Sequence, residues 1–360
     1  MRGVRDVPDR FGAVLPPWKQ TKSVLVILAP ILGAAAAAYA VAGTLPAVAL
    51  LFAVIVSVTA VPALPLWPDC VVLAAATVAA TVGGLLAAGH TGWSVAVVSA
   101  AGLCLYVANR RTAGAASYLP MAAFVQAGSG GAASDKPLLA VGLAAAAGVA
   151  FAVLMIKPAK LHLPRSPVDR RTALRHSLLM AACCAVATWV SFGFHLIHGM
   201  WVMLTLCVVF VPTPGQGPRK AVDRVVATVA GGVASFVLLV TVPKQVTLLV
   251  AVVCIVFSVA WSLKGLAVYR KTVFWTTPGA LLMGGAATPG DLVLNRVVIT
   301  IVVAAVAGTL ASVFLVQPPA AEPAADPQAD PEAESGTESE SAPLRRTGRS
   351  NRTGHSGLTG

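Results

Sequence analysis

Long apolar segments follow one another from Ser23 to Val316, and each is close to the length of a transmembrane helix. Such a helix needs about 20 mostly apolar residues. Only 11% of the 360 residues are charged. About 25% is usual in a soluble domain, so this chain cannot cover a globular surface with polar groups. The sequence therefore predicts an all-α, polytopic membrane protein.

Twelve segments are candidate transmembrane helices. They are Ser23–Gly43, Leu45–Ala63, Cys70–Gly89, Trp93–Ala108, Ala113–Ala127, Leu138–Ile156, Ala173–Phe194, Met200–Val211, Val222–Val242, Gln245–Leu263, Val268–Gly285 and Leu294–Val316. Ala113–Ala127 and Met200–Val211 are the shortest, and each is either a full span or a re-entrant segment. The first segment is expected to stay uncleaved, because its apolar run is too long for a signal peptide.

The positions of Lys and Arg predict the orientation. Cytoplasmic loops of membrane proteins carry an excess of these residues. With twelve spans and the N-terminus inside, only Lys136, Lys244 and Arg296 lie outside. This pattern favours Ala113–Ala127 as a span and predicts a multi-pass membrane protein with both termini cytoplasmic. The net charge of +12 then reflects contact with the lipid bilayer, and nucleic-acid binding is not expected.

The pattern of basic residues, prolines and small residues repeats once along the chain. Arg110-Arg111 precedes Pro120, and Arg270-Lys271 precedes Pro278. We therefore predict two parallel six-helix repeats, related by an axis along the membrane normal. The predicted organisation is a cytoplasmic N-terminal segment (1–22), a first repeat (23–156), a cytoplasmic linker (157–172), a second repeat (173–316) and a disordered cytoplasmic tail (317–360).

Motifs of soluble catalysis are absent from the sequence. It contains no HExxH, no nucleotide-binding loop and no GxSxG. None of the six cysteines forms a CxxC pair, which argues against a metal site. We expect a protein that is not an enzyme, that has no cofactor or metal, and that does not use ATP directly.

The most specific local pattern lies in the second half. It runs from His195-x-x-His198-Gly199-x-Trp201-Val202-Met203-Leu204-Thr205 through Pro212-Thr213-Pro214-Gly215 and Arg219-Lys220-x-x-x-Arg224 to Thr228-x-x-Gly231-Gly232. These residues resemble the fusaric-acid-resistance-like, or aromatic acid exporter, family of integral membrane transporters. Residues 172–316 carry the resemblance well, whereas the first repeat fits through its helix pattern. The resemblance implies efflux of organic or aromatic acids, energised by the proton gradient.

An anionic substrate needs cations or helix N-termini along its path. The candidate substrate-path residues are Arg219, Lys220, Arg224, Arg270, Lys271, Thr205, Trp201, Pro278 and Arg296. The basic residues also fit a role in topology and lipid-headgroup contact, and Arg224 is the best candidate because it lies within a helix start. Arg296 either pairs with Asp291 at the outer mouth or extends to the surface. Pro278 either breaks the eleventh helix or only kinks it.

Proton coupling usually requires a titratable group within the membrane. The chain has no Glu before Glu322, and the candidates are Asp223, His195 and His198, each of which also fits a plain helix-end or loop role. Two other functions stay open: a passive anion channel, and a non-transporting scaffold whose tail recruits a partner. Small-xxx-small patterns indicate close helix packing, either within one chain or in a homo-oligomer.

Overall fold

The computed structural model describes residues 15–64, 66–112, 116–129, 137–157, 168–196, 199–212, 216–262, 269–283 and 289–315. The chain divides into two units, Met1–Val316 and Gln317–Gly360, and every described residue lies in the first. The predicted tail, most of the linker and His198 therefore lie outside the described residues.

Within these ranges the structure is all-α, as predicted, and contains no strand. The helices are α1 (Trp18–Ala42), α2 (Thr44–Ala60), the short 3-10 helix η1 (Val61–Ala63), α3 (Trp67–Ala87), α4 (Thr91–Thr112), α5 (Leu119–Ala127), α6 (Leu138–Ile156), α7 (Arg170–Gly193), α8 (Gly199–Val209), α9 (Gln216–Thr241), α10 (Lys244–Ser262), α11 (Tyr269–Met283) and α12 (Pro289–Phe314). Each α-helix overlaps one of the segments proposed from the sequence, with ends that differ by up to six residues.

Eight of the described helices are long and apolar enough to cross a membrane. They are α1, α2 with η1, α3, α4, α6, α7, α9 and α12. The expectation of a multi-pass membrane protein is thereby confirmed. Twelve full spans are not established, because α5, α8, α10 and α11 do not meet the same requirement within the described residues.

The helices α5 and α8 are much shorter than a membrane is thick. They have 9 and 11 residues, which at about 1.5 Å per residue gives roughly 14 and 16 Å, against a hydrocarbon core of about 30 Å. Helix α5 is shorter than the predicted segment 113–127 because Pro120 stands in its first turn and Gly128 follows its end. Neither α5 nor α8, as described, is long enough by itself to cross the membrane as a helix.

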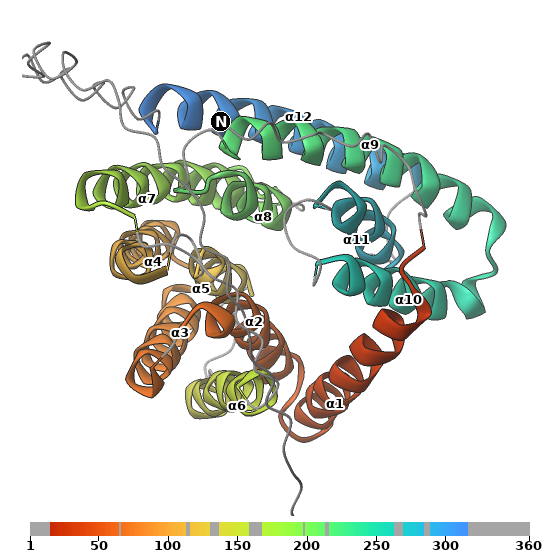
Figure 1. Cartoon of the computed structure of the whole chain (residues 1–360), viewed down its shortest axis with the longest axis horizontal. Helices are drawn as coiled ribbons and strands as arrows, with labels where there is room; N and C mark the ends of the chain where they lie inside the picture. Colours follow the sequence, from red (N-terminus) through yellow and green to blue (C-terminus); the bar gives the residue numbers. More distant parts are fainter. Residues whose placement is uncertain are drawn as a thin grey trace, which may run out of the picture. The chain divides into compact units, whose positions relative to one another are not determined.

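Longer helices surround both short ones (Figure 1). Helix α5 contacts α2, α3, α4 and α8, and α8 also contacts α7, α9 and α12. All but one of the nine residues of α5 are buried. Helix ends within a membrane are tolerated where protein covers them, so the two short helices form the centre of the packed unit.

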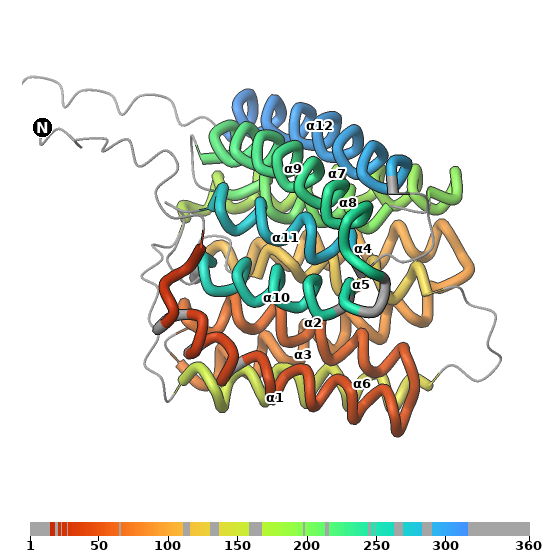
Figure 2. Tube along the Cα trace, turned by 90° about the vertical axis from the view of Figure 1, so that its right-hand side faces the viewer, coloured from red at the N-terminus to blue at the C-terminus, as the bar shows by residue number. Residues whose placement is uncertain are grey.

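The helix contacts follow the same scheme in both halves. Within α1–α6, α2 contacts α6, and α3 contacts α5 and α6; within α7–α12, α8 contacts α12, and α9 contacts α11 and α12. Figure 2 shows α9 and α12 running side by side. The halves meet where α4 packs on α7, where α1 packs on α10 and where α5 packs on α8.

Helix α11 continues through Pro278 without a break. Of the two possibilities considered for Pro278, a broken helix is therefore wrong for the described residues. Proline has no N–H, so the carbonyl of Phe274 loses its usual donor four residues later. Gly231 of α9 packs against this carbonyl, and a Cβ on Gly231 would lie 2.7 Å from the Phe274 oxygen. The proline and the glycine thus bring α9 and α11 into close contact.

Candidate functional site

Two arginine side chains are buried among the helices of the second half. Arg224 on α9 is 4% exposed and Arg296 on α12 is 1% exposed. Charged groups at this depth are rare, and they usually mark a substrate or ion path. Arg224 lies on the same helix face as the small residues Gly217, Ala221, Ala227 and Gly231, which are also buried. This face packs against the neighbouring helices because small residues allow close helix packing. Arg224 is buried because it lies on the same face.

The Arg224 guanidinium has only neutral hydrogen-bond partners. Its Nε donates to Thr205 Oγ1 of α8 at 3.3 Å, and its Nη1 donates to the Tyr269 hydroxyl of α11 at 3.3 Å. The neighbouring carboxylate of Asp223 is hydrogen-bonded to Arg270 instead. The charge of Arg224 is therefore held by hydroxyl groups, and no described carboxylate neutralises it.

Arg296 is stacked on an aromatic ring. Its Cζ lies 3.3 Å from the centroid of the Trp201 ring. Among the described residues, none of its three guanidinium nitrogens has a hydrogen-bond partner. A buried cation–π contact contributes about 2 kcal/mol, whereas desolvation of an ion costs several kcal/mol. Arg296 is thus a buried cation whose charge is only partly compensated.

Both sequence-based interpretations of Arg296 are wrong. The side chain does not extend to the surface, and no hydrogen bond joins it to Asp291. The physical reason is its position: two turns into α12, on the face that contacts α8. The charge of Arg224 also acts on Arg296.

We refer to Arg224, Arg296, Trp201, Thr205 and Tyr269 as the cationic cluster. It combines two guanidinium groups, two aromatic rings and two hydroxyl groups from four helices, α8, α9, α11 and α12. Guanidinium groups bind carboxylates through paired N–H donors, and they also stack on aromatic faces. These groups have the chemistry that recognises an organic anion.

The other predicted cations lie outside the cluster. Arg270 donates to Asp223 from Nε at 3.0 Å and from Nη2 at 2.5 Å, and its side chain is 45% exposed. Lys271 lies 4.5 Å from the centre of the Trp261 ring. Arg219 is exposed, and Lys220 is half-buried. Pro278 is buried in α11, next to the α9 contact.

The predicted proton-coupling residues do not enter the cluster. Asp223 is engaged by Arg270. His195 is exposed in the turn after α7, where its φ of 50° places it in the left-handed region. His198 lies outside the described residues.

Two polar residues escaped the sequence analysis. His176 is fully buried on α7, with Nδ1 2.8 Å from Asn109 Nδ2 and Nε2 3.0 Å from the Phe210 carbonyl oxygen. The available signal was an ionisable side chain inside a proposed span, Ala173–Phe194. Tyr269 was missed because it stands directly before the basic pair Arg270-Lys271.

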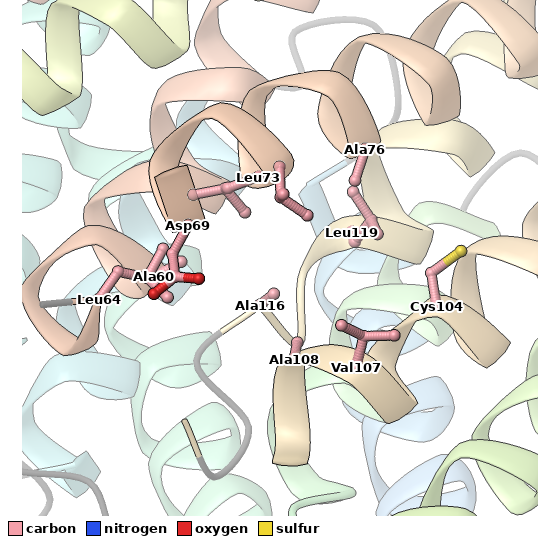
Figure 3. Close-up of a pocket in the computed structure, with 11 residues that line it drawn as sticks. Ala60, Leu64, Asp69, Leu73, Ala76, Cys104, Val107, Ala108, Ala116 and Leu119 are labelled. Atoms are coloured by element: carbon pink, nitrogen blue, oxygen red, sulfur yellow. The ribbon is translucent and has the colours of Figure 1, made fainter. Parts of the chain in front are cut away.

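A cavity in the first half contains none of these residues (Figure 3). Its volume is about 70 Å³, and it is lined by Ala60, Leu64, Asp69, Val72, Leu73, Ala76, Cys104, Val107, Ala108, Ala116 and Leu119. Sites for drug-sized ligands are roughly 300 Å³ or more. The lining is apolar apart from Asp69, so this cavity has neither the size nor the charge for an organic anion. The chemistry points to the cationic cluster instead.

Comparison with family models gave a match in the second half of the chain. Residues 183–314 match the family model described as fusaric acid resistance protein-like. The searches against curated proteins and against solved structures gave no significant match. The matched segment contains all five residues of the cationic cluster. This chain is therefore a multi-pass membrane protein that is similar, over residues 183–314, to fusaric acid resistance protein-like proteins.

Proposed function

We propose that this protein is a secondary transporter that exports organic anions, in particular aromatic carboxylates, across the bacterial cytoplasmic membrane. The observation that carries the proposal is the pair of buried guanidinium groups, Arg224 and Arg296, which no described carboxylate neutralises. The family description is consistent, because export of a compound is one route to resistance. Coupling to the proton gradient belongs to the proposal and follows from the family resemblance.

Each part of the cluster fits one part of such a substrate. The nitrogens of Arg296, which lack a described partner, supply donors for a carboxylate. Trp201 and Arg296 stack on each other, and an aromatic group of the substrate would extend this stack. Arg224, fixed by Thr205 and Tyr269, adds a second positive charge. A bound anion would relieve the repulsion between the two arginines.

The proposal also includes two parallel repeats with both termini in the cytoplasm. The helix contacts that recur between α1–α6 and α7–α12 support the repeat. The helix starts recur at similar spacing as well: Trp18, Thr44, Trp67, Thr91, Leu119 and Leu138, then Arg170, Gly199, Gln216, Lys244, Tyr269 and Pro289. The orientation rests on the excess of Lys and Arg in alternate loops.

A passive anion channel is the second candidate. One observation favours it: the charges of the cluster belong to arginines, which do not release protons in proteins. Of the predicted proton carriers, Asp223 is paired and His195 is exposed. A channel needs only the positive charges.

Transport by purified protein in lipid vesicles separates the two functions. The vesicle interior is held one pH unit more acidic than the outside, and potassium with valinomycin holds the membrane potential at zero. Exchange of one proton for one anion then concentrates a labelled aromatic dicarboxylate inside by up to about tenfold, since one pH unit corresponds to 1.36 kcal/mol. A channel only equalises the concentrations. Unaided diffusion of the protonated acid favours the alkaline side, so the direction of accumulation excludes it.

Two matched variants test the cluster in the same assay. Arg224→Gln is expected to lower transport at least tenfold, because loss of one partner of a buried charged interaction costs about 2–5 kcal/mol. Arg219→Gln changes an exposed arginine of the same helix and is expected to leave transport unchanged. Equal transport by wild type and Arg224→Gln, at equal membrane abundance, would refute the assignment.

A further inference from the structure

At the carboxyl end of α8, a helix of the proposed substrate site, buried backbone carbonyl groups need hydrogen-bond donors from outside the helix. The last carbonyl groups of any helix lack intrahelical donors. Helix α8 ends at Val209, and Phe210, Val211 and Pro212, which follow, are all buried. Buried backbone carbonyls need a partner, and an unsatisfied one costs about 1–3 kcal/mol.

His176 supplies that partner. Its Nε2 lies 3.0 Å from the Phe210 carbonyl oxygen, and the two rings are in contact with centroids 5.4 Å apart. A carbonyl only accepts hydrogen bonds, so Nε2 carries the hydrogen and donates. In the neutral imidazole Nδ1 is then an acceptor, and it receives an N–H of the Asn109 amide at 2.8 Å. Both ring nitrogens are therefore used.

The two partners of His176 belong to different parts of the protein. Phe210 directly follows α8, which carries Trp201 and Thr205 of the cationic cluster. Asn109 is on α4, in the first half, where α4 packs along α7. The imidazole thus links the end of a substrate-site helix to the opposite half of the molecule.

We propose that His176 is a positioning residue for the cationic cluster. It caps α8 through Phe210 and so fixes where Thr205 meets Arg224 and where Trp201 meets Arg296. The inference rests on the proposed function, because it concerns the same anion site. Helix α8 has only 11 residues, so a shift at its end moves the whole helix. Displacement of a binding group by about 1 Å can cost roughly 100-fold in activity.

Substitution by glutamine and by asparagine separates the two hydrogen bonds. The Nε2 of a glutamine occupies the place of the histidine Nε2 and can donate to Phe210. The Oδ1 of an asparagine occupies the place of Nδ1 and can only accept from Asn109. His176→Gln therefore keeps the link to α8, His176→Asn keeps the link to α4, and His176→Leu removes both.

Exchange of labelled for unlabelled aromatic dicarboxylate across vesicles, measured without a gradient, is the test. We expect His176→Asn and His176→Leu to raise the half-saturating concentration at least tenfold, and His176→Gln to change it less than threefold. Ser177→Ala is the control: this neighbouring buried hydroxyl bonds only the Ala173 carbonyl of its own helix, and its loss should leave the concentration unchanged.

The outcomes distinguish the inference from the proposed function. If the wild type exchanges anions and His176→Asn keeps the wild-type half-saturating concentration, the positioning role is refuted. It is also refuted if His176→Gln and His176→Asn weaken binding equally, since that means general destabilisation. If even the wild type shows no exchange, the proposed function itself fails, and the inference fails with it. Membrane abundance and elution on size exclusion show whether each variant is folded.

Discussion

Replacement of Arg296 by methionine should make the protein more stable and inactive. The guanidinium of Arg296 is 1% exposed and its nitrogens have no hydrogen-bond partner among the described residues. Methionine has a similar length, keeps contact with the Trp201 ring through its sulfur and carries no charge. The substitution therefore removes a desolvated cation and retains most of the packing.

The magnitude follows from two opposing terms. Desolvation of the buried cation costs several kcal/mol. Its stacking on Trp201 at 3.3 Å returns about 2 kcal/mol, part of which the methionine–aromatic contact replaces. We expect a net gain of about 2 kcal/mol in the free energy of unfolding. At roughly 2 °C per kcal/mol for a large domain, the melting temperature rises by about 4 °C.

Thermal unfolding in detergent, followed by intrinsic fluorescence, measures this effect with and without an aromatic carboxylate. At a ligand concentration of 100 times Kd, the wild type should gain about 2.7 kcal/mol, and Arg296→Met should gain nothing. Arg219→Met, at an exposed position of α9, is the matched control and should behave like the wild type. If Arg296→Met melts below the wild type without ligand, the buried guanidinium stabilises the fold and our reasoning is wrong.

The remaining predictions use the same unfolding measurement. Tyr269→Phe should destabilise the protein by about 1.5 kcal/mol or more, because it removes an acceptor from the charged Arg224; a gain in stability would contradict the cluster geometry. Asp223→Asn should lower the free energy of unfolding by at most about 1 kcal/mol and leave transport unchanged, because the pair with Arg270 is partly exposed. A large loss of transport would show that Asp223 belongs to the functional site. Gly231→Ala should cost about 1–3 kcal/mol, because its Cβ would lie 2.7 Å from a backbone oxygen. Gly33→Ala meets nothing within 4 Å and should be neutral or slightly stabilising.

Which segments form helices was predictable, because helix formation in an apolar run depends on local composition. A run of about 20 apolar residues can be recognised as a candidate transmembrane helix without knowledge of the helices that pack against it. The prediction weakened at 113–127, where Pro120 and Gly128 limit α5 to nine residues. It was also weak for Pro278, because whether a proline breaks or only bends a helix depends on what packs against the freed carbonyl.

The candidate site was predictable only in part. Trp201, Thr205, Arg224 and Arg296 were named from the sequence, but as separate candidates among several cations. The sequence ranked Arg224 above the other cations, but it did not show that Arg224 is buried and that Arg219, five residues earlier on the same helix, is exposed. His176 and Tyr269 were overlooked because their roles depend on partners far along the chain, Asn109 and Arg224.

By itself, the sequence determined that this chain is a multi-pass helical membrane protein and which segment carries the family likeness. Both properties are local, since apolar runs and short motifs can be recognised in the sequence however the helices pack. Tertiary structure decided which cations face the interior, that Arg296 lies on Trp201, and that His176 holds the end of α8. The physical reason is that helices in lipid are apolar on every side. Their sequences do not mark the face that meets protein, and only the packing of one helix on another selects it.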